Sequence, residues 1–138
     1  MSVGHNSRLV AIIDDDESIQ NALQDLIESD GLPARCFSSA EQFLDSESRY
    51  EAACLIADVR LPGMSGLELQ SKLQTQRRRL PIILITAHGD ADMRIRALRE
   101  GAVEFLSKPF DDAVLLELVH TVLKISSGVH VHFGTPIE

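Results

Sequence analysis

Five short apolar runs alternate with five stretches of helical periodicity along the 138 residues of the chain. Runs this short that are rich in Val, Ile and Leu are typical of strands buried on both faces. Glycines, acidic residues and capping-box pairs such as Ser65 and Glu68 mark the ends of the intervening helices. Because strands that alternate with helices form parallel sheets, we predict a doubly wound α/β domain with a five-stranded parallel sheet and five helices.

The predicted elements occupy residues 8–125. The strands are predicted at 9–13, 34–37, 54–57, 81–85 and 103–106. The helices are predicted over about 17–29, 38–45, 65–76, 90–100 and 111–125, with Asp90 as the cap of the fourth. Residues 1–7 are expected to be a flexible N-terminus. Residues 126–138, which begin with Ser126-Ser127-Gly128, are expected to be a tail or the start of a linker.

Composition and charge narrow the classes of function. Apolar residues make up 44% of the chain, which suits an ordinary globular core. The formal net charge of -8 disfavours direct contact with nucleic acid and suits metal cations or a basic protein surface. No apolar stretch reaches the length of a membrane span, and residues 1–7 lack the apolar core of a signal peptide. We therefore expect no membrane contact and a cytoplasmic location.

Polar residues follow four of the five predicted strands. They are Asp14-Asp15-Asp16 after the first strand, Asp58 after the third, Thr86 after the fourth and Lys108 after the fifth. The carboxyl ends of parallel strands meet at one edge of a sheet, where ligands bind in such folds. Adjacent carboxylates raise one another's pKa unless a cation compensates, and Mg²⁺ needs only one or two protein carboxylates. Asp16 is expected to be a charge in the first turn of the helix rather than a ligand.

These groups suit phosphoryl transfer. A metal ion, a lysine and a hydroxyl around a carboxylate form a cradle for a phosphoryl group. Such transfer needs positioning and charge stabilisation more than covalent chemistry from the protein. A carboxylate can also act as the nucleophile and become an aspartyl phosphate.

Four segments in this order resemble the receiver domain of two-component response regulators, over about residues 8–125. They are Ile13-Asp14-Asp15, the segment from Asp58 to Gly66, Ile85-Thr86-Ala87 and Lys108-Pro109-Phe110. The Asp58 segment is similar to receivers of the nitrogen-fixation regulator (FixJ) type. The resemblance implies a flavodoxin-like and CheY-like sheet with strand order 2-1-3-4-5.

The resemblance also implies a Mg²⁺ site. Asp58 would be the phosphoacceptor and would contact the ion. Asp15 would bind Mg²⁺ directly, Asp14 would assist through a water molecule, and the backbone carbonyl of Arg60 would complete the protein ligands. The phosphoryl group would come from a sensor histidine kinase or a phosphotransfer protein. The domain would catalyse only its own phosphorylation and dephosphorylation.

Thr86 and Phe105 would form the switch that turns phosphorylation into a signal. Lys108 would bridge to Asp58 and the phosphoryl oxygens, and Thr86 would swing in to hydrogen-bond the phosphoryl group. Phe105 would turn inward as Thr86 moves. The bond before Pro109 would be cis. The face formed by helices 90–100 and 111–125 and strand 103–106 would then change for partner binding or homodimer formation.

Three other functions compete with this interpretation. The first is a receiver-like module that binds proteins without being phosphorylated. The second is an enzyme of the haloacid dehalogenase type, which needs an acid two residues after the nucleophile, where this chain has Arg60. The third is a flavodoxin-like cofactor binder, whose phosphate loop would follow the first strand, where this chain has carboxylates. The domain is expected to be either a stand-alone receiver or one cut from a longer protein.

Overall fold

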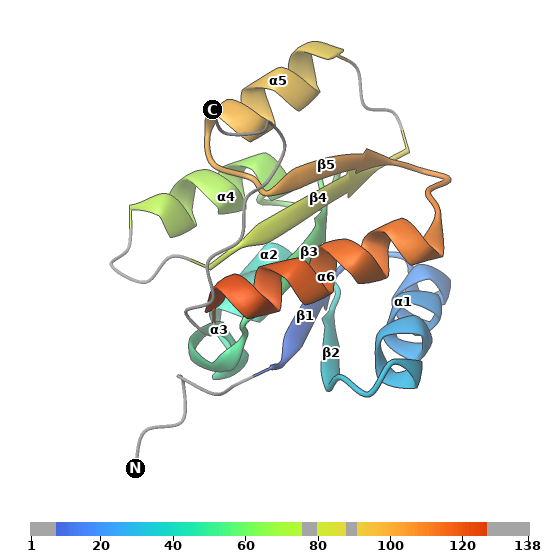
Figure 1. The fold of residues 1–138 in the computed structure, drawn as a ribbon. Helices are drawn as coiled ribbons and strands as arrows, with labels where there is room; N and C mark the ends of the chain where they lie inside the picture. The colour runs from blue at the N-terminus through green and yellow to red at the C-terminus, as the bar shows by residue number, and fades with distance from the viewer. Residues whose placement is uncertain (1–7, 76–79, 88–90, 127–138) are drawn as a thin grey trace.

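The computed structural model describes residues 8–75, 80–87 and 91–126. The strands are β1 (Val10–Ile13), β2 (Ala34–Phe37), β3 (Cys54–Asp58), β4 (Ile82–Thr86) and β5 (Glu104–Ser107). The helices are α1 (Glu17–Ser29), α2 (Ala40–Leu44), α3 (Ser48–Glu51), α4 (Gly66–Gln74), α5 (Ala91–Arg99) and α6 (Asp112–Ser126). The strands form one parallel sheet in the order β2-β1-β3-β4-β5, which confirms the predicted fold class (Figure 1).

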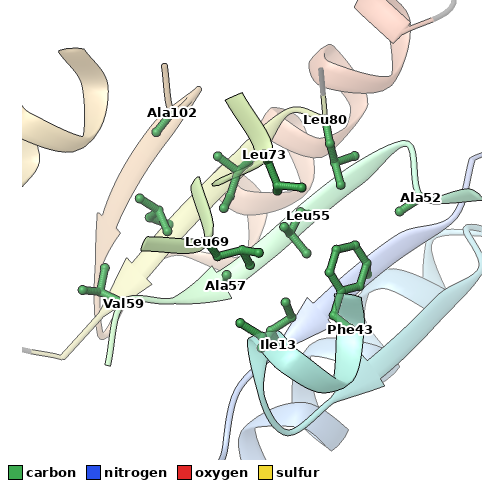
Figure 2. Packing of buried hydrophobic residues seen from close by; sticks show 14 of the residues in the cluster. Ile13, Phe43, Ala52, Leu55, Ala57, Val59, Leu69, Leu73, Leu80 and Ala102 are labelled. Atoms are coloured by element: carbon green, nitrogen blue, oxygen red, sulfur yellow. The ribbon is translucent and has the colours of Figure 1, made fainter. Parts of the chain in front are cut away.

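Helices cover both faces of this sheet. Helices α1 and α6 pack on one face, and α2, α4 and α5 pack on the other (Figure 1). Every residue of β1, β3 and β4 is therefore buried, whereas the edge strands β2 and β5 keep exposed positions. Figure 2 shows Phe43 of α2 and Leu69 of α4 packed over Leu55 and Ala57 of β3.

The region after β2 differs from the prediction. The helix expected over 38–45 is the shorter α2, and a further single turn, α3, follows it, so the described residues hold six helices rather than five. Local polar bonds make this turn, because Ser46 Oγ accepts a hydrogen bond from the Ser48 amide. A turn this short has no apolar periodicity that could reveal it in the sequence.

Several sequence predictions lie outside the described residues. They are the flexible segment 1–7, the Asp90 cap and residues 127–138 of the expected tail. Within the described part of the chain, no helix is both long and apolar enough to cross a membrane.

Candidate functional site

Two buried carboxylates lie side by side where β1 and β3 end. The register pairs Ile13 with Ala57, so Asp14 and Asp58 are the next residues of adjacent parallel strands. Asp14 is only 1% exposed and Asp58 7%. The strand residues before them are apolar and buried, so both acids are buried at the carboxyl edge of the sheet. A buried carboxylate needs hydrogen bonds or an opposite charge to offset the loss of hydration.

Lys108 supplies the positive charge between these acids. Its Nζ lies 3.0 Å from Asp58 Oδ2 and 3.3 Å from Asp14 Oδ2. The backbone N–H of Lys108 donates to the Thr86 carbonyl at 2.8 Å, which aligns the segment after β5 with the end of β4. The following Lys108–Pro109 peptide bond is cis. The structure therefore brings residues separated by 50 and 94 positions into one ion-paired cluster.

One ammonium does not neutralise two carboxylates. Burial raises the pKa of Asp14 above its ordinary value of 3.8, and the nearby charge of Asp58 adds to this. The Asp16 amide and the Lys108 ammonium act in the opposite direction but do not outweigh burial. For Lys108, burial favours the neutral amine, but the hydrogen bonds and charges of Asp58 and Asp14 raise its pKa overall. The cluster thus keeps Lys108 charged and has excess negative charge that a cation would relieve.

Asp14→Asn is expected to stabilise the metal-free protein. A raised folded-state pKa means that the ionised carboxylate costs stability above that pKa, and that this cost disappears as the pH falls toward 3.8. We expect the free energy of unfolding to rise by about 1 kcal/mol at pH 7 and the gain to shrink in acid. Urea unfolding in a chelator at several pH values measures this, with exposed Asp25→Asn as the control. A loss of stability at pH 7 would contradict it.

The start of α1 holds Asp14 in place. Asp14 Oδ1 accepts a hydrogen bond from the Asp16 amide at 2.9 Å, and Gln20 Nε2 donates to the Asp14 carbonyl at 2.6 Å. Asp16 is the N-cap of α1 and accepts from the Ser18 amide, which agrees with its expected role in the helix rather than in the site. Hydrogen bonds from Ser18 lower the pKa of Asp16. Gln20 was missed in the sequence because its partners include the distant Phe37 carbonyl of β2.

The loop after β3 approaches Asp58 closely. The Arg60 amide donates to Asp58 Oδ1 at 2.9 Å, and Arg60 itself is exposed. At the start of α4, a Cβ on Gly66 would lie 2.5 Å from the Asp58 carbonyl oxygen. Only glycine therefore permits this approach, and Gly66 was not recognised as a site residue from the sequence.

The remaining predicted site residues lie around this cluster. Asp15 is exposed next to Asp14, and Thr86 is fully buried at the end of β4. Phe105 is 2% exposed and belongs to the core under α2, α4 and α5. In this structure Phe105 therefore already has the inward position that the switching hypothesis assigned to the activated state.

The donors at this edge fit a hard divalent cation. Among the described residues, no three or more His, Cys, Asp or Glu side chains form a cluster arranged to hold a metal. Mg²⁺ does not require such a cluster, since it keeps several waters and uses one or two carboxylates. The oxygens of Asp14, Asp15 and Asp58, with the Arg60 carbonyl, provide the right chemistry, and the excess negative charge favours a cation.

Comparison with known sequences gives one family. The family model described as "Response regulator receiver domain" matches residues 10–120. Response regulator protein TmoT of Ectopseudomonas mendocina is 43% identical over 118 residues, which cover 86% of this chain and 54% of TmoT. The chain thus spans about half the length of the curated relatives it matches.

Comparison with solved structures also gives response regulators with a similar fold. Full-length FixJ from B. japonicum superposes with a TM-score of 0.78 at 34% identity, over 86% of this chain and 58% of FixJ. The beryllofluoride-activated NtrC4 receiver domain dimer gives a TM-score of 0.80 at 25% identity, over 87% of this chain and 99% of that one.

Proposed function

The chain belongs to the response-regulator receiver family, and on this premise we propose that it accepts a phosphoryl group on Asp58 from a histidine kinase or a phosphotransfer protein. The observation that carries this proposal is the contact of one Lys108 ammonium with both Asp58 and Asp14 at the carboxyl edge of the sheet. The cluster provides the buried carboxylate of Asp58 as a nucleophile and the fixed positive charge of Lys108. Because two carboxylates share one ammonium, its excess negative charge also favours a bound cation. A protein-binding module that is not phosphorylated would have no need for such a costly arrangement.

In the proposed reaction an oxygen of Asp58 attacks phosphorus in line with the bond to the donor nitrogen. The new O–P bond forms as the P–N bond breaks, and the electron pair of that bond stays on the imidazole nitrogen, which takes up a proton. Lys108 is already 3.0 Å from Asp58 and can follow the charge onto the phosphoryl oxygens. The Arg60 amide holds the other carboxylate oxygen and so orients the nucleophile.

Asp14, Asp15, Asp58 and the Arg60 carbonyl would hold Mg²⁺. The bound ion would neutralise charge that develops on the phosphoryl oxygens. Incubation with acetyl phosphate and Mg²⁺, followed by intact mass, tests the proposal. One phosphoryl adduct that a chelator prevents is expected, and the absence of any adduct from folded protein would overturn it.

Thr86 is proposed to pass the modification to the output face. Its buried hydroxyl group stands at the end of β4, and its carbonyl binds the Lys108 amide. At the start of the neighbouring strand β5, Arg94 of α5 donates to the Phe105 carbonyl at 2.7 Å and pairs with Glu104 at 3.0 Å, so α5 and β5 are tied together. A phosphoryl group can shift this packing only through contacts that differ between two states. Thr86 is well placed to make such a contact.

Thr86→Ala is therefore expected to separate phosphorylation from its consequence. The variant keeps the carboxylates and Lys108, so the phosphoryl adduct should still form. Beryllofluoride with Mg²⁺ should produce dimers of the wild type, by analogy with the beryllofluoride-activated NtrC4 receiver domain dimer, and should not do so for Thr86→Ala. We expect the dimer contact to lie on α5, β5 and α6. Size-exclusion chromatography at high concentration measures this. If both proteins form dimers equally, Thr86 has no part in the switch. If the wild type forms no dimer, the proposed output by dimer formation is wrong.

A further inference from the structure

The segment between β3 and α4, residues 59–65, directly follows Asp58, and its Arg60 amide donates to Asp58 Oδ1 at 2.9 Å. Its first end is tied to the sheet, because the Val59 amide donates to the Ile85 carbonyl of β4 at 2.8 Å. The Gly66 amide donates to the Val59 carbonyl at 2.9 Å and so joins the two ends of the segment. Inside the segment, a contact comes from another element. The Met64 amide donates to Oε2 of Glu41 at 2.9 Å, across 23 residues of sequence.

Glu41 lies directly against this segment. A Cβ built on Gly63 would be 2.6 Å from Glu41 Oε2, so the carboxylate occupies space that any other residue would fill. Gly63 also has φ +73°, a conformation that glycine adopts without cost. The two observations are consistent, because the same glycine that permits the turn also lets the carboxylate reach the Met64 amide.

Helix α2 gives Glu41 a firm base. Ser39 caps this helix by accepting a hydrogen bond from the Gln42 amide at 3.0 Å. Two residues after Glu41, Phe43 is fully buried and makes an edge-to-face contact with Phe37, with ring centroids 5.4 Å apart. The position of the Glu41 backbone is therefore set by the core. In the loop, Arg60, Pro62 and Gly63 are exposed, and only Leu61 and Met64 pack partly against the core.

We propose that Glu41 is a positioning residue that holds residues 60–64 in the conformation that presents the Arg60 carbonyl to Mg²⁺. The inference rests on the proposed function, since it gives Glu41 a role at the same site. A carboxylate that accepts from a backbone N–H makes a charge-assisted bond, which is stronger than a neutral one. Glu41 does not touch the ion; it acts through the backbone of the loop.

The test is a Mg²⁺ titration of the whole chain followed by backbone amide NMR shifts, with the unfolding temperature in a chelator measured in parallel. Glu41→Ala is expected to weaken Mg²⁺ binding about 10-fold, at the lower end of the effects of outer-shell partners. Glu41→Gln, which keeps an oxygen acceptor, should restore most of the affinity. The matched control is Glu47→Ala, which removes an exposed carboxylate that makes no cap hydrogen bond with α3.

The outcomes separate this inference from the proposed function. A wild type that binds no Mg²⁺ and forms no adduct overturns the proposed function. A wild type that binds Mg²⁺, together with unchanged affinity in Glu41→Ala, overturns only the role of Glu41. A lower unfolding temperature with unchanged Mg²⁺ affinity also overturns it, because it would show a purely structural contact.

A double-mutant cycle checks the contact itself. Gly63→Ala places a methyl group against the Glu41 carboxylate and also strains the backbone, and only the first effect depends on Glu41. Gly63→Ala should therefore weaken Mg²⁺ binding by a smaller factor in the Glu41→Ala background than in the wild type. Equal factors in both backgrounds would contradict the proposed contact.

Discussion

Asp58→Asn is expected to abolish phosphorylation by acetyl phosphate. The amide is not nucleophilic, and it cannot form the ion pair that Asp58 makes with Lys108 at 3.0 Å. The Asn oxygen can still accept from the Arg60 amide, so the variant should fold. Intact mass after incubation with acetyl phosphate and Mg²⁺ measures the result, and circular dichroism verifies that the variant is folded.

The matched control for this variant is Asp25→Asn, an exposed position on α1 that has no part in the site. It should be phosphorylated like the wild type. An adduct that persists in Asp58→Asn would place the reaction on another side chain. It would leave the Lys108 cluster without its proposed function.

Gly66→Ala is expected to destabilise the protein strongly, although alanine favours helices. Gly66 starts α4 with a negative φ, so helix propensity alone would predict a gain of up to about 1 kcal/mol. The added Cβ would instead lie 2.5 Å from the Asp58 carbonyl oxygen and 3.0 Å from the Val59 Cα. Both are backbone atoms that cannot rotate away. We expect a loss of about 2–3 kcal/mol in the free energy of unfolding, as for other overpacked sites.

Urea unfolding measures this loss of stability, and the rate of phosphorylation is measured as a second, independent quantity. The clash acts on the backbone of Asp58 itself, so phosphorylation should slow in Gly66→Ala. Gly31→Ala is the control, because it has φ +86° with no atom within 4 Å of the new Cβ. It should lose stability through backbone strain alone and keep its phosphorylation rate. A stabilised Gly66→Ala would show that α4 does not approach Asp58 as described.

The sequence predicted the sheet and its polar edge because both depend on local patterns. Strand β2 and helix α1 were predicted with their observed bounds, since apolar periodicity and Gly31 mark them clearly. Asp14, Asp58 and Lys108 were expected to meet because parallel strands end at one edge, and they do.

The contacts that support the site could not be predicted in this way. Gln20 and Glu41 act on backbone atoms 17 and 23 residues away, and neither has a local pattern that distinguishes it from a solvated helix residue. The inward position of Phe105 likewise depends on how α5 packs against β5. Such pairings arise from tertiary packing, which spacing alone does not specify.

A crystal structure of the chain with Mg²⁺ and beryllofluoride tests most directly the claim that Asp58 accepts the phosphoryl group. Beryllofluoride mimics an aspartyl phosphate but is not hydrolysed. We expect the adduct on Asp58, with Lys108 Nζ and the Thr86 hydroxyl group in contact with its fluorine atoms. One ion is also expected, bound directly by oxygens of Asp15, Asp58 and Arg60 and contacted by Asp14 through a water molecule. An adduct on another residue, or crystals grown with both reagents that show Lys108 still bridging Asp14 and Asp58 with no ion, would contradict it.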